Sequence, residues 1–218
     1  MFTGIIQAIG RITAMEQRGG DFRIRLNTGK LPLADVQLGD SIAVNGVCLT
    51  AVALPGDGFE ADVSGETIAC TSLGQLAVGC DVNLEKALTL STPLGGHLVS
   101  GHVDGLGEVK KRYDEGRSVR FDIEAPKAIA HYIAEKGSIT VNGVSLTVNQ
   151  ISGRVFTLNI VPHTLQETTL QSMKVGSKIN LEVDVIARYL ERLITGKQEQ
   201  DNEVSGITMA FLNKHGIG

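Results

Sequence analysis

The heptapeptide VNGVCLT at residues 44–50 recurs as VNGVSLT at residues 141–147, with one cysteine replaced by serine. The offset between the copies is 97 residues (147 minus 50), and it also aligns FTGIIQAIG, from Phe2, with VSGHVDGLG, from Val99. VGCDVNLE and VGSKINLE fall into the same register, so no gap is needed between the matching blocks. Self-similarity at a fixed period is the signature of a repeat. The sequence therefore predicts two homologous domains in tandem.

Composition limits the classes of protein to which the chain can belong. It has 218 residues, of which 42% are hydrophobic, enough for packed cores. Its 20 basic and 24 acidic residues give a net charge of -4 without a basic block, which argues against nucleic acid binding. Its first residues lack the pattern of a signal peptide, and its long uncharged runs carry Gly, Asn and Pro, so no membrane span is expected.

The three cysteines, Cys48, Cys70 and Cys80, have no metal-ligand spacing and cannot all pair within one chain. We therefore expect a reducing, cytoplasmic location and no bound metal.

Within each copy, apolar residues recur mainly at a period of two, as in Phe22, Ile24 and Leu26 with arginines between them. This alternation is typical of half-buried strands. Expected strand runs in the first copy are residues 2–12, bending at Gly10, and residues 22–26, 41–54, 59–63 and 82–88. Short strands bounded by glycines favour a mainly β fold of two homologous six-stranded antiparallel Greek-key β-barrels.

Helical patterns interrupt and follow the strands. Residues 125–137 place Pro126 at an N1-like position and predict a small helix that stops at Gly137. Residues 184–196 carry apolar side chains at i, i+3, i+4 and i+7 and predict an amphipathic C-terminal α-helix, which either packs on its own barrels or mediates self-association. A polar link, 197–206, and a second short helical pattern, 207–216, follow it.

Positions at which the two copies differ are candidates for functional residues. Aligned pairs that differ in polarity or reactivity are Cys48 with Ser145, Ile5 with His102, Gln7 with Asp104, Glu66 with His163, and Ala87 with Asp184. Ser145 and Thr147 are two residues apart on a predicted strand and share one face, as Cys48 and Thr50 do. Each barrel can thus offer two small polar groups to one pocket.

Each of these residues also has a purely structural interpretation. A cysteine such as Cys48 is more often a buried, inert thiol than a reactive one, and His102 on an apolar strand is more often structural than catalytic. The Ser and Thr hydroxyls could bond across strands, and Asp184 could be an N-cap. The Gly-rich SGHVDGLG lacks the strand-to-helix context of a dinucleotide loop.

Several longer motifs together favour a function. MFTGIIQ at the start, GDSIAVNGVCLT, GGHLVSGHVDG, GSITVNGVSLT and the closing ITMAFLNKHG make the sequence resemble the riboflavin synthase family over nearly its whole length. The resemblance implies two lumazine-binding barrels, residues 1–97 and 98–186, and a C-terminal helical segment, 187–218, that holds a homotrimer. It also makes lumazine synthase a candidate partner.

The reaction implied by the resemblance is a dismutation of two 6,7-dimethyl-8-ribityllumazine molecules. One gives four carbons to the other, yielding riboflavin and 5-amino-6-ribitylamino-uracil, and no metal or redox cofactor is implied. Two identical substrates suit two similar pockets. Holding both in register can supply up to roughly 7 to 11 kcal/mol of the barrier in the best intramolecular cases. The duplication therefore has a chemical rationale.

The resemblance also carries over site residues. In the first barrel the substrate would meet Gly4, Ile5, Ile6, Ser41, Cys48, Leu49, Thr50, Asp62, Val63, Ser64, Gly65, Glu66 and Thr67. In the second it would meet Gly101, His102, Val103, Lys136, Ser145, Leu146, Thr147, Asn159, Ile160, Val161, Pro162, His163, Thr164 and Asp184. As catalytic candidates, His102 with Ser145 and Thr147 would assist methyl deprotonation or activate a nucleophile, while Cys48 would orient or activate the other lumazine. In the family the productive pair joins the first barrel of one subunit to the second barrel of a neighbour.

Two alternatives come from other classes. A lumazine-binding antenna protein would share both barrels without catalysis, but such relatives are expected to lose polar residues of the second repeat, and SGHVDG and NGVSLT are intact here. A flavin-binding barrel of an oxidoreductase would need a nucleotide-binding second domain, which the sequence does not predict.

Overall fold

The computed structural model describes residues 1–204, with side chains up to residue 195. The chain divides into two compact units. Met1–Asp184 contains both barrels, and the second unit begins at Val185 with the C-terminal helix.

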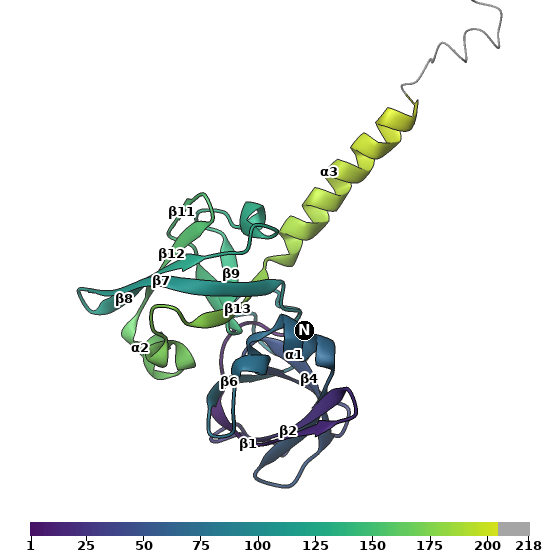
Figure 1. Ribbon diagram of the computed structural model, residues 1–218, viewed down its shortest axis with the longest axis vertical. Coiled ribbons are helices and arrows are strands. Elements are labelled where there is room, and N and C mark those ends of the chain that lie inside the picture. The colour runs from purple at the N-terminus through teal and green to yellow at the C-terminus, as the bar shows by residue number, and fades with distance from the viewer. Residues whose placement is uncertain (205–218) are drawn as a thin grey trace, which may run out of the picture. The chain divides into compact units, whose positions relative to one another are not determined.

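The first repeat is a closed, all-antiparallel barrel with the strand order β1-β2-β5-β4-β3-β6, and Figure 1 views it nearly along its axis. Its strands are β1 (Ala8–Arg18), β2 (Asp21–Asn27), β3 (Ser41–Val44), β4 (Val47–Ala53), β5 (Gly58–Val63) and β6 (Asp81–Lys86). Residues at every second position face inward, as in β5, where Phe59, Ala61 and Val63 are buried. The barrel interior is therefore filled by side chains, and polar groups of the strands lie on its outer face.

The second repeat has the same strands displaced by 97 residues, with one break. They are β7 (Gly105–Glu115), β8 (Ser118–Glu124), β9 (Ser138–Val141), β10 (Val144–Thr147), β11 (Gln150–Ser152), β12 (Val155–Ile160) and β13 (Lys178–Val183). The sheet order is β10-β9-β13-β7-β8-β12-β11, so its two edge strands follow one another in the chain and together correspond to β4. At the break the Val148 amide donates to Gly137 O at 3.0 Å and the Asn149 amide to Thr157 O at 2.8 Å. The predicted fold class is confirmed, and the second copy differs by this interruption.

The strand predictions were wrong at two places. The run at residues 41–54 is a hairpin, because Asn45 and Gly46 have φ angles of 46° and 79° and form a tight turn between β3 and β4. The first strand begins at Ala8 and not at residue 2, and it continues to Arg18. Residues 2–6 leave the barrel for a different partner, described below.

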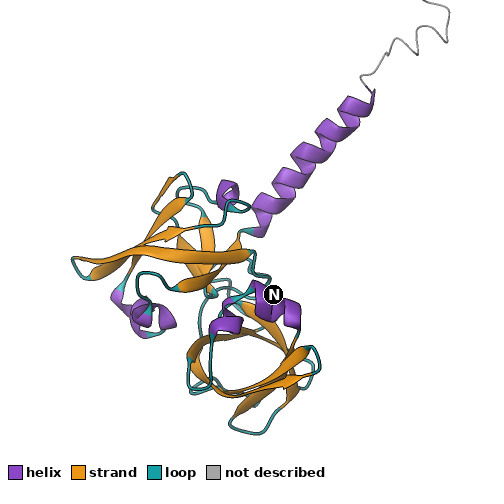
Figure 2. Ribbon diagram, viewed as in Figure 1, coloured by secondary structure: helices purple, strands orange, loops and turns teal. Residues whose placement is uncertain are grey.

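Figure 2 shows the helices between and after the strands. They are α1 (Gly65–Cys70), α2 (Pro162–Gln166) and α3 (Val185–Val204), with the 3₁₀ turns η1 (Ser72–Gln75), η2 (Ala130–Tyr132) and η3 (Thr169–Ser172). The small helix expected over residues 125–137 is only the short η2 turn, since its apolar residues serve the barrel core. The predicted C-terminal helix is present, but α3 continues to Val204 through most of the expected polar link. The pattern at residues 207–216 lies outside the described residues.

Four asparagines hold the two barrels together around a pseudo-twofold axis. Asn83 Nδ2 donates to Asn142 O at 3.0 Å, and its counterpart Asn180 donates to Asn45 O at 2.8 Å. Asn83 Oδ1 accepts from the Thr169 amide and Asn180 Oδ1 from the Ser72 amide, both at 2.7 Å. Asn83 and Asn180 are almost completely buried, so each of these bonds satisfies a group shielded from water.

Candidate functional site

Cys48 and Thr50 lie on the outer face of β4, as their spacing predicts. The inward residues of this strand are buried, whereas Cys48 is half-buried and Thr50 is exposed. On β3, Ser41 pairs directly with Thr50, so its side chain lies on the same face. These three residues make a small polar patch on the outside of the first barrel.

The second barrel repeats this patch with a hydroxyl in place of the thiol. Ser145 is half-buried and Thr147 exposed on β10, where Thr147 pairs with Ser138, the counterpart of Ser41. The two patches therefore share one arrangement of strand residues, with a serine hydroxyl in the second where the first has a cysteine thiol.

Each patch is completed by a chain segment from the other repeat. The Cys48 amide donates to Gly101 O at 2.9 Å, and the Ser145 amide donates to Gly4 O at 2.8 Å. Ile6 packs against the core of the second barrel and Val103 against that of the first. The expectation that placed Gly4, Ile5 and Ile6 with the first barrel and Gly101, His102 and Val103 with the second is thus wrong, because these segments are exchanged.

The exchange occurs where the two segments cross. Phe2 and Val99 form an isolated antiparallel bridge, with N···O distances of 2.7 Å and 3.1 Å. Gly4 and Gly101 then adopt φ angles of +75° and +81°. A Cβ on Gly4 would lie 2.6 Å from Ser145 Cβ, and one on Gly101 would lie 2.7 Å from Cys48 Cβ. Only glycine allows this close approach of the segment to the strand.

Two buried glutamates fix the exchanged segments. Glu85 accepts hydrogen bonds from the Thr3 amide and hydroxyl, both at 2.7 Å, and from the Gly4 amide at 3.0 Å. Its counterpart Glu182 accepts the same three bonds from Ser100 and Gly101. Burial raises the pKa of both carboxyls above the usual value, and this outweighs the opposing effect of the hydrogen bonds.

Ser145 has a histidine partner that the predicted list lacks. His97 Nδ1 lies 2.7 Å from Ser145 Oγ, and the imidazole is buried. Burial lowers the pKa of His97 below 6.5, against a smaller opposing effect of the Asp184 carboxylate. At neutral pH this ring is therefore uncharged.

His102 follows Gly101 and is exposed beside the first barrel, where its amide donates to Ser100 Oγ at 3.2 Å. Within the described residues no hydrogen bond joins His102 to Ser145 or Thr147. The predicted grouping of these three side chains is not present as a contact within one chain.

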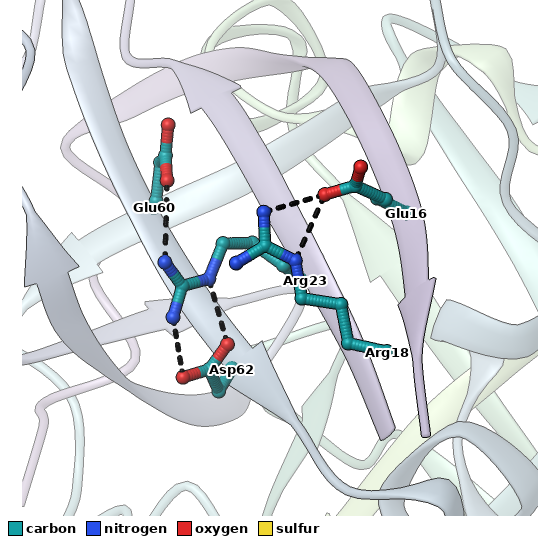
Figure 3. Close-up of polar contacts among 5 residues, drawn as sticks. All are labelled: Glu16, Arg18, Arg23, Glu60 and Asp62. Atoms are coloured by element: carbon teal, nitrogen blue, oxygen red, sulfur yellow. Dashed lines mark hydrogen bonds and ion pairs between the residues drawn. The ribbon is translucent and has the colours of Figure 1, made fainter. Parts of the chain in front are cut away.

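Asp62 is engaged by an arginine on the neighbouring strand, as Figure 3 shows. Arg23 holds both of its carboxylate oxygens, at 2.8 Å and 2.7 Å, and lies 3.7 Å from Glu60. This bidentate pairing lowers the pKa of Asp62. A second ion pair in the figure joins Arg18 to Glu16. Any contact of Asp62 with a substrate hydroxyl would be made by an ionised carboxylate already oriented by Arg23.

The remaining predicted residues lie at strand ends and helix starts. Ser64 caps α1 by accepting from the Thr67 amide at 3.1 Å, Pro162 occupies the first turn of α2, and Lys136 has a positive φ of 64°. Exposed positions are Ser64, Glu66, Lys136, Asn159, Val161 and His163; half-buried ones are Gly65, Thr67, Leu146, Pro162, Thr164 and Asp184; buried ones are Leu49, Val63 and Ile160. The three buried side chains face the cores, so only their backbones are available to a ligand.

Among the described residues no group of three or more His, Cys, Asp or Glu side chains is placed to hold a metal ion. In the same part of the chain no helix has the length and apolar character needed to cross a membrane.

Comparison with known proteins identifies the family. The lumazine binding domain matches residues 3–87 and again residues 100–184. The chain is 50% identical over 217 residues to riboflavin synthase of Photobacterium phosphoreum, covering 100% of this chain and 99% of that protein. The chain belongs to the riboflavin synthase family. Riboflavin synthase of Bacillus subtilis (strain 168) is 40% identical over 217 residues, with all of both chains covered.

Solved structures agree with membership of the riboflavin synthase family. LumP complexed with riboflavin has a TM-score of 0.78 at 30% identity, and LumP complexed with 6,7-dimethyl-8-(1'-D-ribityl) lumazine has 0.76 at 28%. Each comparison covers 84% of this chain and 99% of the LumP chain.

His97, which contacts Ser145, is not among the site residues predicted from the sequence of this riboflavin synthase family member. The signal that could have found it is GGHLVSGH, which holds two histidines, His97 and His102, five residues apart. His97 precedes the aligned part of the second repeat, so comparison of the two copies could not reveal it.

Proposed function

We propose that the chain is a riboflavin synthase that dismutates two 6,7-dimethyl-8-ribityllumazine molecules into riboflavin and 5-amino-6-ribitylamino-uracil. The observation that carries this proposal is the pair of matched patches at Cys48 and Ser145, one on each lumazine binding domain. Two copies of one substrate need two similar sites, and a transfer between them needs sites that differ. The full-length likeness to riboflavin synthases supports the same reaction.

The proposed catalytic residues are Cys48, His102, Ser145 and Thr147. Cys48 and His102 serve the patch of the first barrel, because Gly101 ties the His102 segment to Cys48. Ser145 and Thr147 serve the second. The residues carried over at strand ends and helix starts would bind the pteridine edge and the ribityl hydroxyls. Positioning two substrates in register is the main catalytic effect, worth up to roughly 7 to 11 kcal/mol in the best intramolecular cases.

One assay tests the reaction directly. The purified protein is incubated with 6,7-dimethyl-8-ribityllumazine alone, and both products are quantified by chromatography. We expect one riboflavin and one pyrimidine product for every two lumazines consumed, with no added cofactor. Lumazine that is not converted to riboflavin would contradict the proposal.

The second candidate function is a protein that binds lumazine or flavin without turning it over. The LumP complexes with riboflavin and with the ribityl lumazine favour it, because they belong to solved structures of the same fold. Binding of lumazine, seen by fluorescence, without any riboflavin formed would support this alternative over the enzyme.

We further propose that a productive site pairs the first barrel of one subunit with the second barrel of a neighbour. Variants Cys48→Ala and Ser145→Ala would each lose activity, and mixing them after dissociation would restore part of it, since some mixed pairs hold two intact patches. If mixing restores nothing although mixed oligomers form, each site lies within a single chain.

The proposed assembly is a homotrimer joined through α3. This helix carries an exposed apolar stripe made of Ile186, Tyr189, Leu190, Leu193 and Ile194. Leu193→Glu keeps helix propensity but places a charge in the stripe, so light scattering should report a monomer. The control Thr195→Glu, on an exposed position off the stripe, should leave the trimer intact. Equal oligomeric states for both variants would contradict the role of α3.

The other expectations from the sequence remain predictions. They are the division into residues 1–97, 98–186 and 187–218, a cytoplasmic location, the lack of a cofactor requirement and docking with lumazine synthase. Co-elution of the two purified proteins would test the last of these.

A further inference from the structure

His97 makes a contact with the second patch that has no counterpart at the first. Its Nδ1 lies 2.7 Å from Ser145 Oγ, while its Nε2 is buried and has no hydrogen-bond partner among the residues that the structure describes. Cys48 is the aligned position in the first repeat, and in the described part of the chain no imidazole lies within hydrogen-bonding distance of its thiol. The two patches therefore differ by more than sulfur and oxygen.

Backbone contacts of Gly96 and His97, in the segment that joins the two barrels, hold His97 in this position. The His97 amide donates to Thr3 O at 3.1 Å, and Thr3 is itself fixed by Glu85. A Cβ on the preceding Gly96 would lie 2.1 Å from Thr3 O and 2.9 Å from Ser145 Oγ. The chain therefore passes directly over the Ser145 hydroxyl, with no room for any other residue at position 96. Such packing is what keeps a functional side chain within its productive geometry.

We propose that His97 is a positioning residue for the reaction: it accepts the Ser145 hydroxyl proton and thereby turns Ser145 Oγ into the base that deprotonates the lumazine bound at the second barrel. This inference rests on the proposed function. Ser145 Oγ takes a proton from the C7 methyl group while its own proton passes to His97 Nδ1. The electron pair of the broken C–H bond stays on the lumazine and spreads into the pteridine. The imidazolium later returns its proton through Ser145, so no external reactant is consumed.

The surroundings of His97 keep it able to accept a proton. Burial holds its pKa below 6.5, so the ring is neutral at neutral pH. Asp184, which follows β13, is the charged group that acts on it and would stabilise the imidazolium as it forms. The buried carboxyls Glu85 and Glu182 are occupied by the exchanged segments.

The test compares His97→Asn with Ser145→Ala, their double variant and a matched control, His131→Asn, whose imidazole is exposed on η2 and has no role in the proposed site. Asn keeps a polar atom near the Nδ1 position but cannot take a proton. Three quantities are measured: kcat for riboflavin formation, Kd for riboflavin by fluorescence, and the rate of deuterium uptake into the C7 methyl group in D₂O by NMR.

We expect His97→Asn to lower both kcat and methyl exchange by about 100-fold, the lower end of the range for general base catalysis. Riboflavin binding should stay within about twofold of wild type, the usual additivity error. The double variant should be no slower than Ser145→Ala. The wild-type kcat should fall as the pH drops through the His97 pKa, because the protonated ring cannot accept, and His97→Asn and Ser145→Ala should both lack this dependence.

Three results would overturn the inference while leaving the proposed function intact. They are a kcat of His97→Asn within twofold of His131→Asn, a double variant whose loss is the product of the single losses, and an acid limb that persists in Ser145→Ala. The last measurement uses only wild type and Ser145→Ala, so it decides the question even if His97→Asn fails to fold. A wild-type protein that makes no riboflavin from lumazine overturns the proposed function and this inference together.

Discussion

Replacing Asn180 by alanine should cost a large part of the stability that joins the two barrels. The Asn180 side chain donates to Asn45 O at 2.8 Å and accepts from the Ser72 amide at 2.7 Å, and both partners belong to the other repeat. Alanine leaves this carbonyl and this amide unpaired at positions that are 4% exposed. An unsatisfied buried group costs about 1 to 3 kcal/mol, so the two together should lower the free energy of unfolding by about 2 to 6 kcal/mol.

The assay is equilibrium unfolding in urea, followed by circular dichroism at neutral pH. Asn83→Ala removes the equivalent pair of bonds on the other side of the axis and should cost a similar amount. The control is Asn27→Ala, which removes solvent-exposed bonds to the Gly29 amide and to Asp57 and should cost less than about 1 kcal/mol. A loss below about 1 kcal/mol for Asn180→Ala would refute the reasoning, because it would mean that water or a shifted neighbour satisfies both groups.

Two further predictions concern the exchanged segments. Gly101→Ala should weaken lumazine binding at the first barrel, as measured by fluorescence titration. The new Cβ would lie 2.7 Å from Cys48 Cβ, at a residue whose φ is +81°. Unchanged affinity would contradict this prediction, because it would show that the segment can move away without cost to the site. Glu182→Gln should alter the pH dependence of stability. The pKa of Glu182 is raised above 4.5 in the folded protein, so its contribution is present below that value and is lost as pH rises through the folded pKa. The unfolding free energy of wild type minus that of Glu182→Gln should therefore fall between pH 4.5 and pH 7, and a difference that is constant with pH would contradict this.

The fold could be predicted from the sequence because the two copies encode it twice. Every strand, helix and 3₁₀ turn of the second repeat, apart from η2 and β11, starts 97 residues after its counterpart. Alternation of apolar residues then indicated which side chains fill each barrel, as with Phe59 and its counterpart Phe156, both fully buried. The hairpin at Asn45 and Gly46 was missed because the strand period continues across a two-residue turn, although Asn-Gly is a strong turn signal.

The candidate site could be predicted only in part, because half of its arrangement is long-range. Spacing alone placed Cys48 with Thr50, and Ser145 with Thr147, on shared outer faces. No local pattern specifies that residues 2–6 dock on the other barrel, since a segment that continues a strand looks the same whichever sheet it joins. The contact of His97 with Ser145 is also long-range, since it spans 48 residues.

The exchange of segments explains why the duplication and the asymmetry of the site belong together. Neither patch is completed by the leading segment of its own repeat: the Cys48 patch needs Gly101, and the Ser145 patch needs Gly4. A single repeat could complete its patch only by exchanging segments with another copy of itself, and both sites would then be identical by symmetry. Joining two repeats in one chain keeps the reciprocal contacts but lets each half change separately. The linker that joins them also brings His97 to Ser145 alone, so the connection that duplicated the site also supplies a means by which its two halves differ.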